Sequence, residues 1–193
     1  MSTSRRQRHE DAHGKESIDS IHTDAALRGA LHSIYVAQFN AIKACEHAFD
    51  KGHATRMLTG LMGSRPWSWR VIGITPAALE KLAKNDYERP TRELQRGHIF
   101  NRSDTAKALY IDSDQPFPLD DFFKFFLERD KTVIMINEEN PHRAKGDFPA
   151  FIEIDERAGL FPCGSLIGWQ HRPEEKEFLR DLYEKQGKGD RHS

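Results

Sequence analysis

The residues best suited to chemistry lie in a locally basic stretch, from Glu88 to Lys107, of a chain that is neutral overall. The chain holds 29 Lys and Arg against 30 Asp and Glu, so net charge indicates no class of partner. Arginines three and four residues apart share one face of a helix and can contact several phosphate oxygens together. We therefore predict a nucleic-acid-binding surface, made by Arg89, Arg92, Arg96, Asn101, Arg102 and Lys107.

His98 is the candidate acid or base of this surface. Asn101 and Asp104 follow it at intervals of three residues, which would bring an amide and a carboxylate to the same side of a helical turn. A histidine with a carboxylate neighbour is the usual arrangement of a general base and its orienting group. The first hypothesis is a nucleic-acid-associated protein, and more specifically a small phosphodiester-cleaving enzyme. The competing interpretation is a solvated surface helix rich in Arg and Glu, with His98 as a capping or core-edge residue beside Gly97.

A second group of polar residues, between Asn137 and Arg143, follows a predicted buried strand. Such positions suit functional sites, because the strand holds the backbone while the side chains reach solvent. The predicted catalytic residues are His98, Asp104, Glu138 and His142. Glu138, Glu139 and His142 also have the ligand chemistry for a divalent metal, but their spacing matches no strong metal-binding motif. We predict an acidic loop here and no metal site, and no glycine-rich pattern indicates a nucleotide cofactor.

Aromatic residues provide a third feature. Trp67 and Trp69 lie between Arg65 and Arg70, a combination that can stack on bases while binding phosphate. Alternate residues of a strand share a face, so at least one of the two tryptophans is expected in the core. The Phe-rich segment 122–126 spans too wide an arc for a one-sided surface helix. Burial is the expected explanation, and an apolar patch for a partner is the alternative.

The second hypothesis is a non-enzymatic interaction or regulatory module that acts through the long N-terminal helix or the Phe-rich helix. Between Thr23 and Gly52, apolar residues recur at spacings of three and four, which predicts one long helix. Alanines along it would let another helix approach closely, so a homodimer is a candidate assembly. An enzyme would gather His98, a carboxylate and a cation in one cleft, whereas a module would present a flat apolar patch.

The rest of the chain must supply the elements that position these residues. Residues 1–22 almost lack apolar side chains and are predicted to form a disordered tail, before a single domain at 23–186 and a frayed end at 187–193. Strands are predicted at 69–74, 131–136, 148–154 and 165–169, and helices at 77–85, 90–94, 103–110, 119–127 and 172–186. Strands and helices do not alternate strictly. We therefore predict an α+β fold, with a small, mostly antiparallel sheet of about four strands packed with five or six helices.

Composition excludes several classes of protein. The two cysteines, Cys45 and Cys163, lie far apart, as expected for unpaired thiols in a reducing compartment. No apolar run approaches the roughly 18 residues that span a bilayer, and the basic N-terminus is not followed by the apolar stretch of a signal peptide. We expect a soluble, cytoplasmic protein without a membrane partner.

Overall fold

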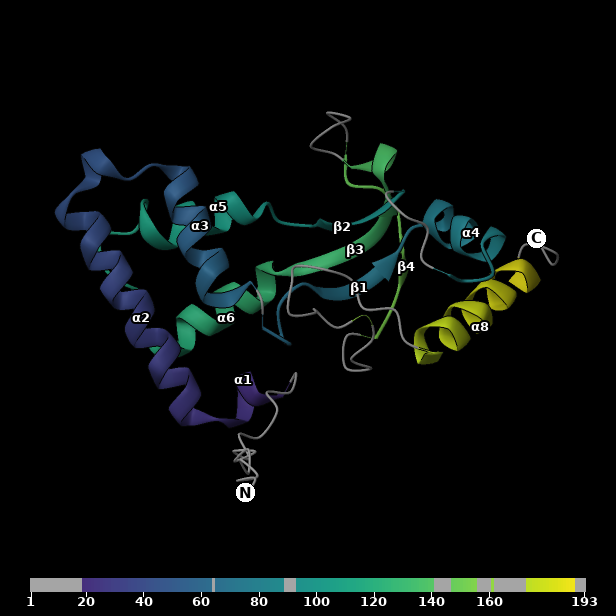
Figure 1. Ribbon diagram of the computed structural model, residues 1–193, viewed down its shortest axis with the longest axis horizontal. Helices are drawn as coiled ribbons and strands as arrows, with labels where there is room; N and C mark the ends of the chain where they lie inside the picture. Colours follow the sequence, from purple (N-terminus) through teal and green to yellow (C-terminus); the bar gives the residue numbers. More distant parts are fainter. Residues whose placement is uncertain are drawn as a thin grey trace, which may run out of the picture.

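The computed structural model describes residues 19–63, 65–88, 93–140, 147–155, 161 and 173–189. Helices and one four-stranded sheet make up this part of the chain, which confirms the predicted α+β class (Figure 1). The strand predicted at 165–169 lies outside the described residues. Within these ranges, no helix combines the length and the apolar character needed to cross a membrane.

The sheet has the order β2-β3-β1-β4. At its centre, β1 (Arg70–Ile74) and β3 (Lys131–Ile136) run parallel, while β2 (Leu94–His98) pairs antiparallel with β3 and β4 (Ile152–Glu153) pairs antiparallel with β1. The β-branched residues of β3 favour a buried strand, and four of its residues in a row are buried. His98 pairs with Thr132. The last residue of β2 therefore lies at the end of the sheet where β1 and β3 begin.

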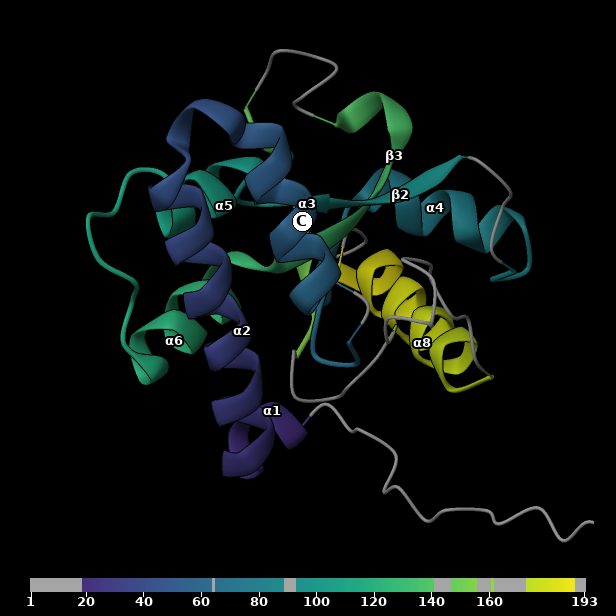
Figure 2. The same ribbon diagram turned by 60° about the vertical axis from the view of Figure 1, so that its left-hand side comes forward.

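Two groups of helices pack around this sheet. The first group consists of α1 (Ser20–Thr23), α2 (Ala25–Ala44), α3 (Lys51–Met62), α5 (Arg102–Tyr110) and α6 (Leu119–Arg129). The second consists of α4 (Pro76–Lys84) and α8 (Pro173–Gly189), and the short 3₁₀ turns are η1 (Glu46–Ala48) and η2 (Asn137–Glu139). Figures 1 and 2 show the first group on one side of the molecule and α4 with α8 on the other. Each group has its own cluster of buried apolar side chains.

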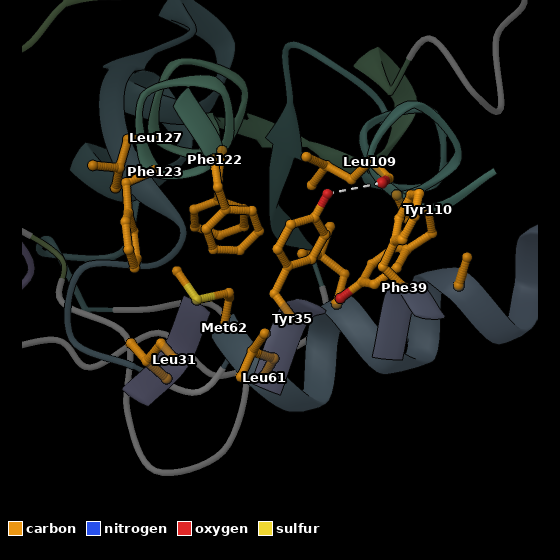
Figure 3. Close-up of a cluster of buried hydrophobic side chains, with 14 of the residues drawn as sticks. Leu31, Tyr35, Phe39, Leu61, Met62, Leu109, Tyr110, Phe122, Phe123 and Leu127 are labelled. Carbon is orange, nitrogen blue, oxygen red and sulfur yellow. Dashed lines mark hydrogen bonds between the residues drawn. The ribbon is translucent and has the colours of Figure 1, made fainter. Parts of the chain in front are cut away.

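Tyr35 is at the centre of the larger cluster, which we call the helical core (Figure 3). Its ring stacks on Phe122 at a centroid distance of 4.3 Å. Its hydroxyl donates to the Leu109 carbonyl at 3.0 Å and accepts from the Phe117 backbone N–H at 3.0 Å. The buried hydroxyl therefore has a donor and an acceptor, as a polar group inside a core requires. Phe122, Phe123 and Phe126 are all buried, so the predicted burial of the Phe-rich helix is confirmed.

The predicted long N-terminal helix is confirmed as α2, but it does not continue to Gly52, because the chain turns after Ala44. Cys45 leaves helical geometry, with φ −139° and ψ 50°, and a new helix begins after Asp50. The Asp50 side chain accepts from the His53 backbone N–H at 2.8 Å, which is the role of an N-cap residue. Gly52 lies inside α3 and ends no helix. The break lets α3 fold back and contribute to the same core as α2.

The helix predicted at 90–94 does not include Leu94, which is the first residue of a strand. Residues 89–92 lie outside the described residues, and from Leu94 onward the chain is strand β2. Pairing with β3 determines this conformation, since all residues of β2 have partners there. An added Cβ at Gly97 would lie 2.5 Å from the Met135 Cε, so a larger residue there would require the Met135 side chain to shift. Arg96 and His98 therefore share a face of a strand, where side chains alternate.

Both predicted domain boundaries fall inside helices. The first three residues of the short helix α1 belong to the predicted tail, and Ile21 among them is fully buried. At the other end, α8 continues to Gly189.

Candidate active site at the start of the central strands

Asp130 is the centre of a buried polar network between α6 and β3. Its side chain is 2% exposed. One carboxylate oxygen, Oδ1, accepts from His98 Nε2 at 3.1 Å and from Arg102 Nη2. The other, Oδ2, accepts from Ser68 Oγ and from the Trp69 backbone N–H, both at 2.8 Å. Four donors therefore surround one buried carboxylate.

These donors explain how Asp130 remains charged where it is. It caps the C-terminal end of α6, where the helix dipole disfavours an anion, and burial raises the pKa of a carboxyl group. The hydrogen bond from His98 and the charge of Arg102 more than offset this burial, so that the pKa of Asp130 lies below its ordinary value. The network thus holds Asp130 as a carboxylate.

His98 presents a neutral imidazole to this carboxylate. Its side chain is 10% exposed. Burial is the main cause that lowers the pKa of His98, and the charges of Arg102 and Arg96 lower it further, whereas Asp130 raises it. Because an ionised carboxylate only accepts, Nε2 must carry the proton of the hydrogen bond. Nδ1 then holds the lone pair, and it has no hydrogen-bond partner in the part of the chain that the structure describes. A neutral imidazole oriented by a carboxylate has the chemistry of a general base.

Arg102 provides the positive charge of the network. It is the first residue of α5 and is only 9% exposed. Its Nη2 also donates to Ser68 Oγ at 2.9 Å, and its guanidinium carbon lies 4.6 Å from the centre of the Trp69 ring. Nε and Nη1 are buried without a hydrogen-bond partner among the described residues. Arg102 is thus turned toward Asp130 rather than toward a phosphate in solvent.

Trp67 and Trp69 have different environments. Trp67 is fully buried in the helical core, which confirms that at least one of the pair belongs to a core. Trp69 is half-buried, and its ring centre lies 4.2 Å from that of His98. It forms one wall of the site.

No protein-family model, curated protein or solved structure matches this chain. The geometry of the site is therefore the basis for its chemistry, because a fold alone does not determine a function.

Among the predicted phosphate-binding residues, Arg96 and Asn101 bond the protein itself. Arg96 Nη1 donates to the carbonyls of Trp69 at 3.2 Å and Phe161 at 3.3 Å. The Asn101 side chain caps α5 by accepting from the Ser103 backbone N–H at 3.2 Å. Arg96 still contributes positive charge beside His98, whereas Asn101 serves the start of a helix.

Asp104 and Lys107, both on α5, form surface ion pairs. Lys51 Nζ lies 2.5 Å from the Asp104 carboxylate, and Lys107 Nζ lies 2.7 Å from that of Asp112. All four side chains are about half exposed, so these pairs contribute little to stability. The carboxylate that orients His98 is therefore Asp130 and not Asp104.

The structure separates Glu138 from His98. Glu138 is an exposed residue of η2, which follows Ile136. Ile136 pairs with Leu94, at the opposite end of β2 from His98. The other predicted site residues, Arg89, Arg92 and His142, lie outside the described residues.

The neighbouring Glu139 has a structural contact. Its Oε2 accepts from Thr75 Oγ1 at 2.6 Å and from the Ile136 backbone N–H at 3.1 Å. Among the described residues, no group of three or more His, Cys, Asp or Glu side chains is arranged to hold a metal ion. The acidic turn η2 therefore stabilises the end of β3.

A groove of about 440 Å³ lies at the far end of β1 from His98, where α4 follows β1. It is lined by Pro76, Leu79, Glu80, Ile152, Tyr183, Gln186 and Gly187. No residue of the Asp130 network belongs to this lining. The groove and the candidate site are separate features.

Proposed function

We propose that the protein is a nucleic-acid-associated enzyme that cleaves phosphodiester bonds, with His98 as general base and Asp130 as the residue that positions it. The main support for this proposal is the hydrogen bond of 3.1 Å from His98 Nε2 to Asp130 Oδ1. This bond orients a neutral imidazole and leaves Nδ1 as the basic nitrogen. A cytoplasmic location is part of the proposal, since Cys45 is an exposed free thiol of the kind that a reducing compartment preserves.

Positive charge around His98 supports a phosphate-containing substrate. Arg70 and Lys131 are paired at the start of β1 and β3, and both are half-buried. Arg96 and Arg102 lie close enough to lower the pKa of His98. Cations from several elements thus lie at the end of the sheet that holds His98, in a chain without net positive charge. Such a field attracts polyanions and positions their phosphates.

The proposed reaction is hydrolysis by an activated water molecule. Nδ1 of His98 takes a proton from water as the water oxygen bonds to phosphorus, and the bond from phosphorus to the leaving oxygen breaks. The imidazolium then returns its proton to the leaving oxygen, which departs as an alcohol. The Asp130 carboxylate stabilises the imidazolium between these two transfers.

Cleavage of labelled DNA and RNA, single- and double-stranded, tests the proposed reaction. His98→Gln is expected to lower the rate by roughly 10²–10⁴-fold, the usual contribution of general acid–base catalysis, and to leave binding nearly unchanged. His47→Gln is the matched control, because His47 is an exposed residue of η1 and its loss should leave the rate intact. Equal rates for His98→Gln and the wild type would remove His98 from the mechanism.

The salt dependence of binding tests the nucleic-acid part separately. Arg65 and Lys131 are half-buried cations that lie close in sequence to Trp69 and Asp130. Changing both to Ala should flatten the plot of log affinity against log salt by about two units if each contacts a phosphate. Lys185→Ala, on the exposed surface of α8, should leave the slope unchanged. If wild-type protein at low salt binds neither DNA nor RNA at micromolar concentration, the proposal fails.

A second candidate function, a non-enzymatic module that self-associates, is favoured by the outer face of α2. This face exposes Ala30, Ile34, Ala37, Ala41 and Ala44, and Ile34 is 48% exposed. The nearest cations turn inward: Arg28 pairs with Asp120, and Lys43 donates to the Ile111 carbonyl at 2.8 Å. An uncharged exposed stripe of this kind fits another helix better than water.

Light scattering over a range of concentrations tests this candidate. Ile34→Glu should abolish self-association with little effect on thermal stability, because the side chain is largely in solvent already. Lys124→Glu introduces the same negative side chain at an exposed position of α6 and should not change association. A monomer at every concentration of the wild type would exclude the α2 homodimer.

A further inference from the structure

Trp69 has a backbone conformation that its side chain disfavours. It directly precedes β1 and has φ of 60°. This left-handed region is uncommon for any residue with a Cβ and is a genuine outlier for a bulky one. Glycine adopts the same conformation without steric cost. The presence of tryptophan at this position therefore needs a reason beyond the path of the backbone.

Contacts on all sides hold Trp69 in this conformation. Its backbone N–H donates to Asp130 Oδ2 at 2.8 Å. Its carbonyl accepts from Arg96 Nη1 at 3.2 Å and from Thr132 Oγ1 at 3.1 Å. The indole Nε1 donates to the Gly63 carbonyl at 3.0 Å. Strained residues persist where their surroundings over-determine them, and they concentrate at functional sites.

The indole occupies the space beside the His98 imidazole. The two ring centres are 4.2 Å apart, with an angle of 56° between the ring planes. The Arg102 guanidinium also contacts the indole, so the ring lies against both side chains that bond Asp130 Oδ1. A smaller residue would open space in which the imidazole could turn about its Cβ–Cγ bond. A half-turn of this kind would place Cε1 where Nε2 now lies, and the hydrogen bond to Asp130 would be lost.

We propose that Trp69 is a positioning residue, which fixes the imidazole of His98 with Nε2 on Asp130 and Nδ1 available to the reaction. The strain at Trp69 arises because this backbone conformation holds a bulky residue where glycine would be unstrained. The catalytic meaning of this inference rests on the proposed function. The contact between the two rings, and its effect on the tautomer of His98, can be measured without any substrate.

The test is nuclear magnetic resonance of ¹⁵N-labelled histidine, which distinguishes the two imidazole tautomers. In the wild type near pH 7, His98 should show one tautomer with the proton on Nε2. Trp69→Ala should lose this single tautomer, giving averaged nitrogen signals and a titration midpoint closer to that of an exposed histidine. Trp69→Phe keeps an aromatic ring against the imidazole and should retain the wild-type signals.

Trp67→Phe is the matched control. It removes an indole two residues away that is fully buried in the helical core, so it should lower stability without changing the His98 signals. If Trp69→Ala does not fold, Trp69→Leu keeps apolar volume without a ring plane and should still lose the single tautomer.

Two outcomes separate this inference from the proposed function. A fixed Nε2–H tautomer in folded Trp69→Ala or Trp69→Leu would overturn the positioning role, whatever the protein cleaves. Loss of the tautomer in those variants, in a protein without nuclease activity, would support the positioning role and leave the proposed function without support.

Discussion

Asp130→Ala is expected to lower the free energy of unfolding by about 3–5 kcal/mol, the usual cost of removing one partner of a buried ion pair. The change leaves the guanidinium of Arg102 in a site where it is only 9% exposed. Two of its nitrogen atoms already have no hydrogen-bond partner among the described residues, and Nη2 would keep only Ser68. The backbone N–H of Trp69 would lose its acceptor as well. Urea unfolding followed by circular dichroism measures the difference.

Two further variants show whether the buried charge is the cause. Asp104→Ala breaks an ion pair whose carboxylate side chain is 53% exposed, and it should cost less than about 1 kcal/mol. Asp130→Leu combined with Arg102→Met replaces the buried pair by apolar side chains and should recover much of the lost stability. If Asp130→Ala costs no more than Asp104→Ala, the network does not stabilise the fold as described.

The same unfolding experiment at several pH values follows the two titrating groups. The pKa of His98 is lowered in the folded protein, chiefly by burial, so the unfolded chain binds this proton first. The stability that neutral His98 contributes is present above pH about 6.5 and is lost as the pH falls below it. The pKa of Asp130 is also lowered. Its contribution is present above about pH 4 and is lost on further acidification, so the difference between wild type and Asp130→Ala should shrink there.

The sequence predicts best those elements that local chemistry specifies. The Thr75 side chain accepts from the Ala78 backbone N–H at 3.2 Å, and Pro76 is the first residue of α4. Those two residue types mark a helix start wherever they occur together. The β-branched run of β3 likewise predicts a buried strand from its own composition.

Spacing along the sequence could not identify the residue that orients His98. Spacing suggests Asp104, six residues away, whereas the structure brings Asp130 to the imidazole through the pairing of His98 with Thr132. A strand register is a property of two distant segments, and it decides which side chains meet. One signal for Asp130 was present: an acidic residue at the C-terminal end of a helix opposes the dipole, and so requires compensation from elsewhere.

Burial, too, changes the meaning of a residue type. Arg102 resembles any surface arginine in sequence, because nothing beside it indicates that a carboxylate lies within reach. The break after Ala44 shows a related conflict, since the apolar periodicity of α2 continues through the turn while Asp50 caps a new helix. Periodicity reports which side chains can be buried, but the cap determines where the helix begins.

Phe122→Ala is the second change with a large expected effect, a loss of about 3–5 kcal/mol in the free energy of unfolding. The ring is fully buried. It stacks on Tyr35 and meets Phe123 edge to face at a centroid distance of 5.0 Å, as Figure 3 shows for the helical core. Removing it deletes these contacts and leaves a cavity between α2 and α6 that the surrounding helices can only partly fill. Urea unfolding again provides the measurement.

Phe100→Ala is the matched control, because it removes the same side chain from a position that is 43% exposed and packs on one side against Arg129. It should cost clearly less than Phe122→Ala, since less apolar surface returns to water. A negligible effect of Phe122→Ala on stability, together with a loss of self-association, would contradict the burial of this helix and make it a contact surface. A large cost with unchanged association would leave the outer face of α2 as the surface to test for a homodimer.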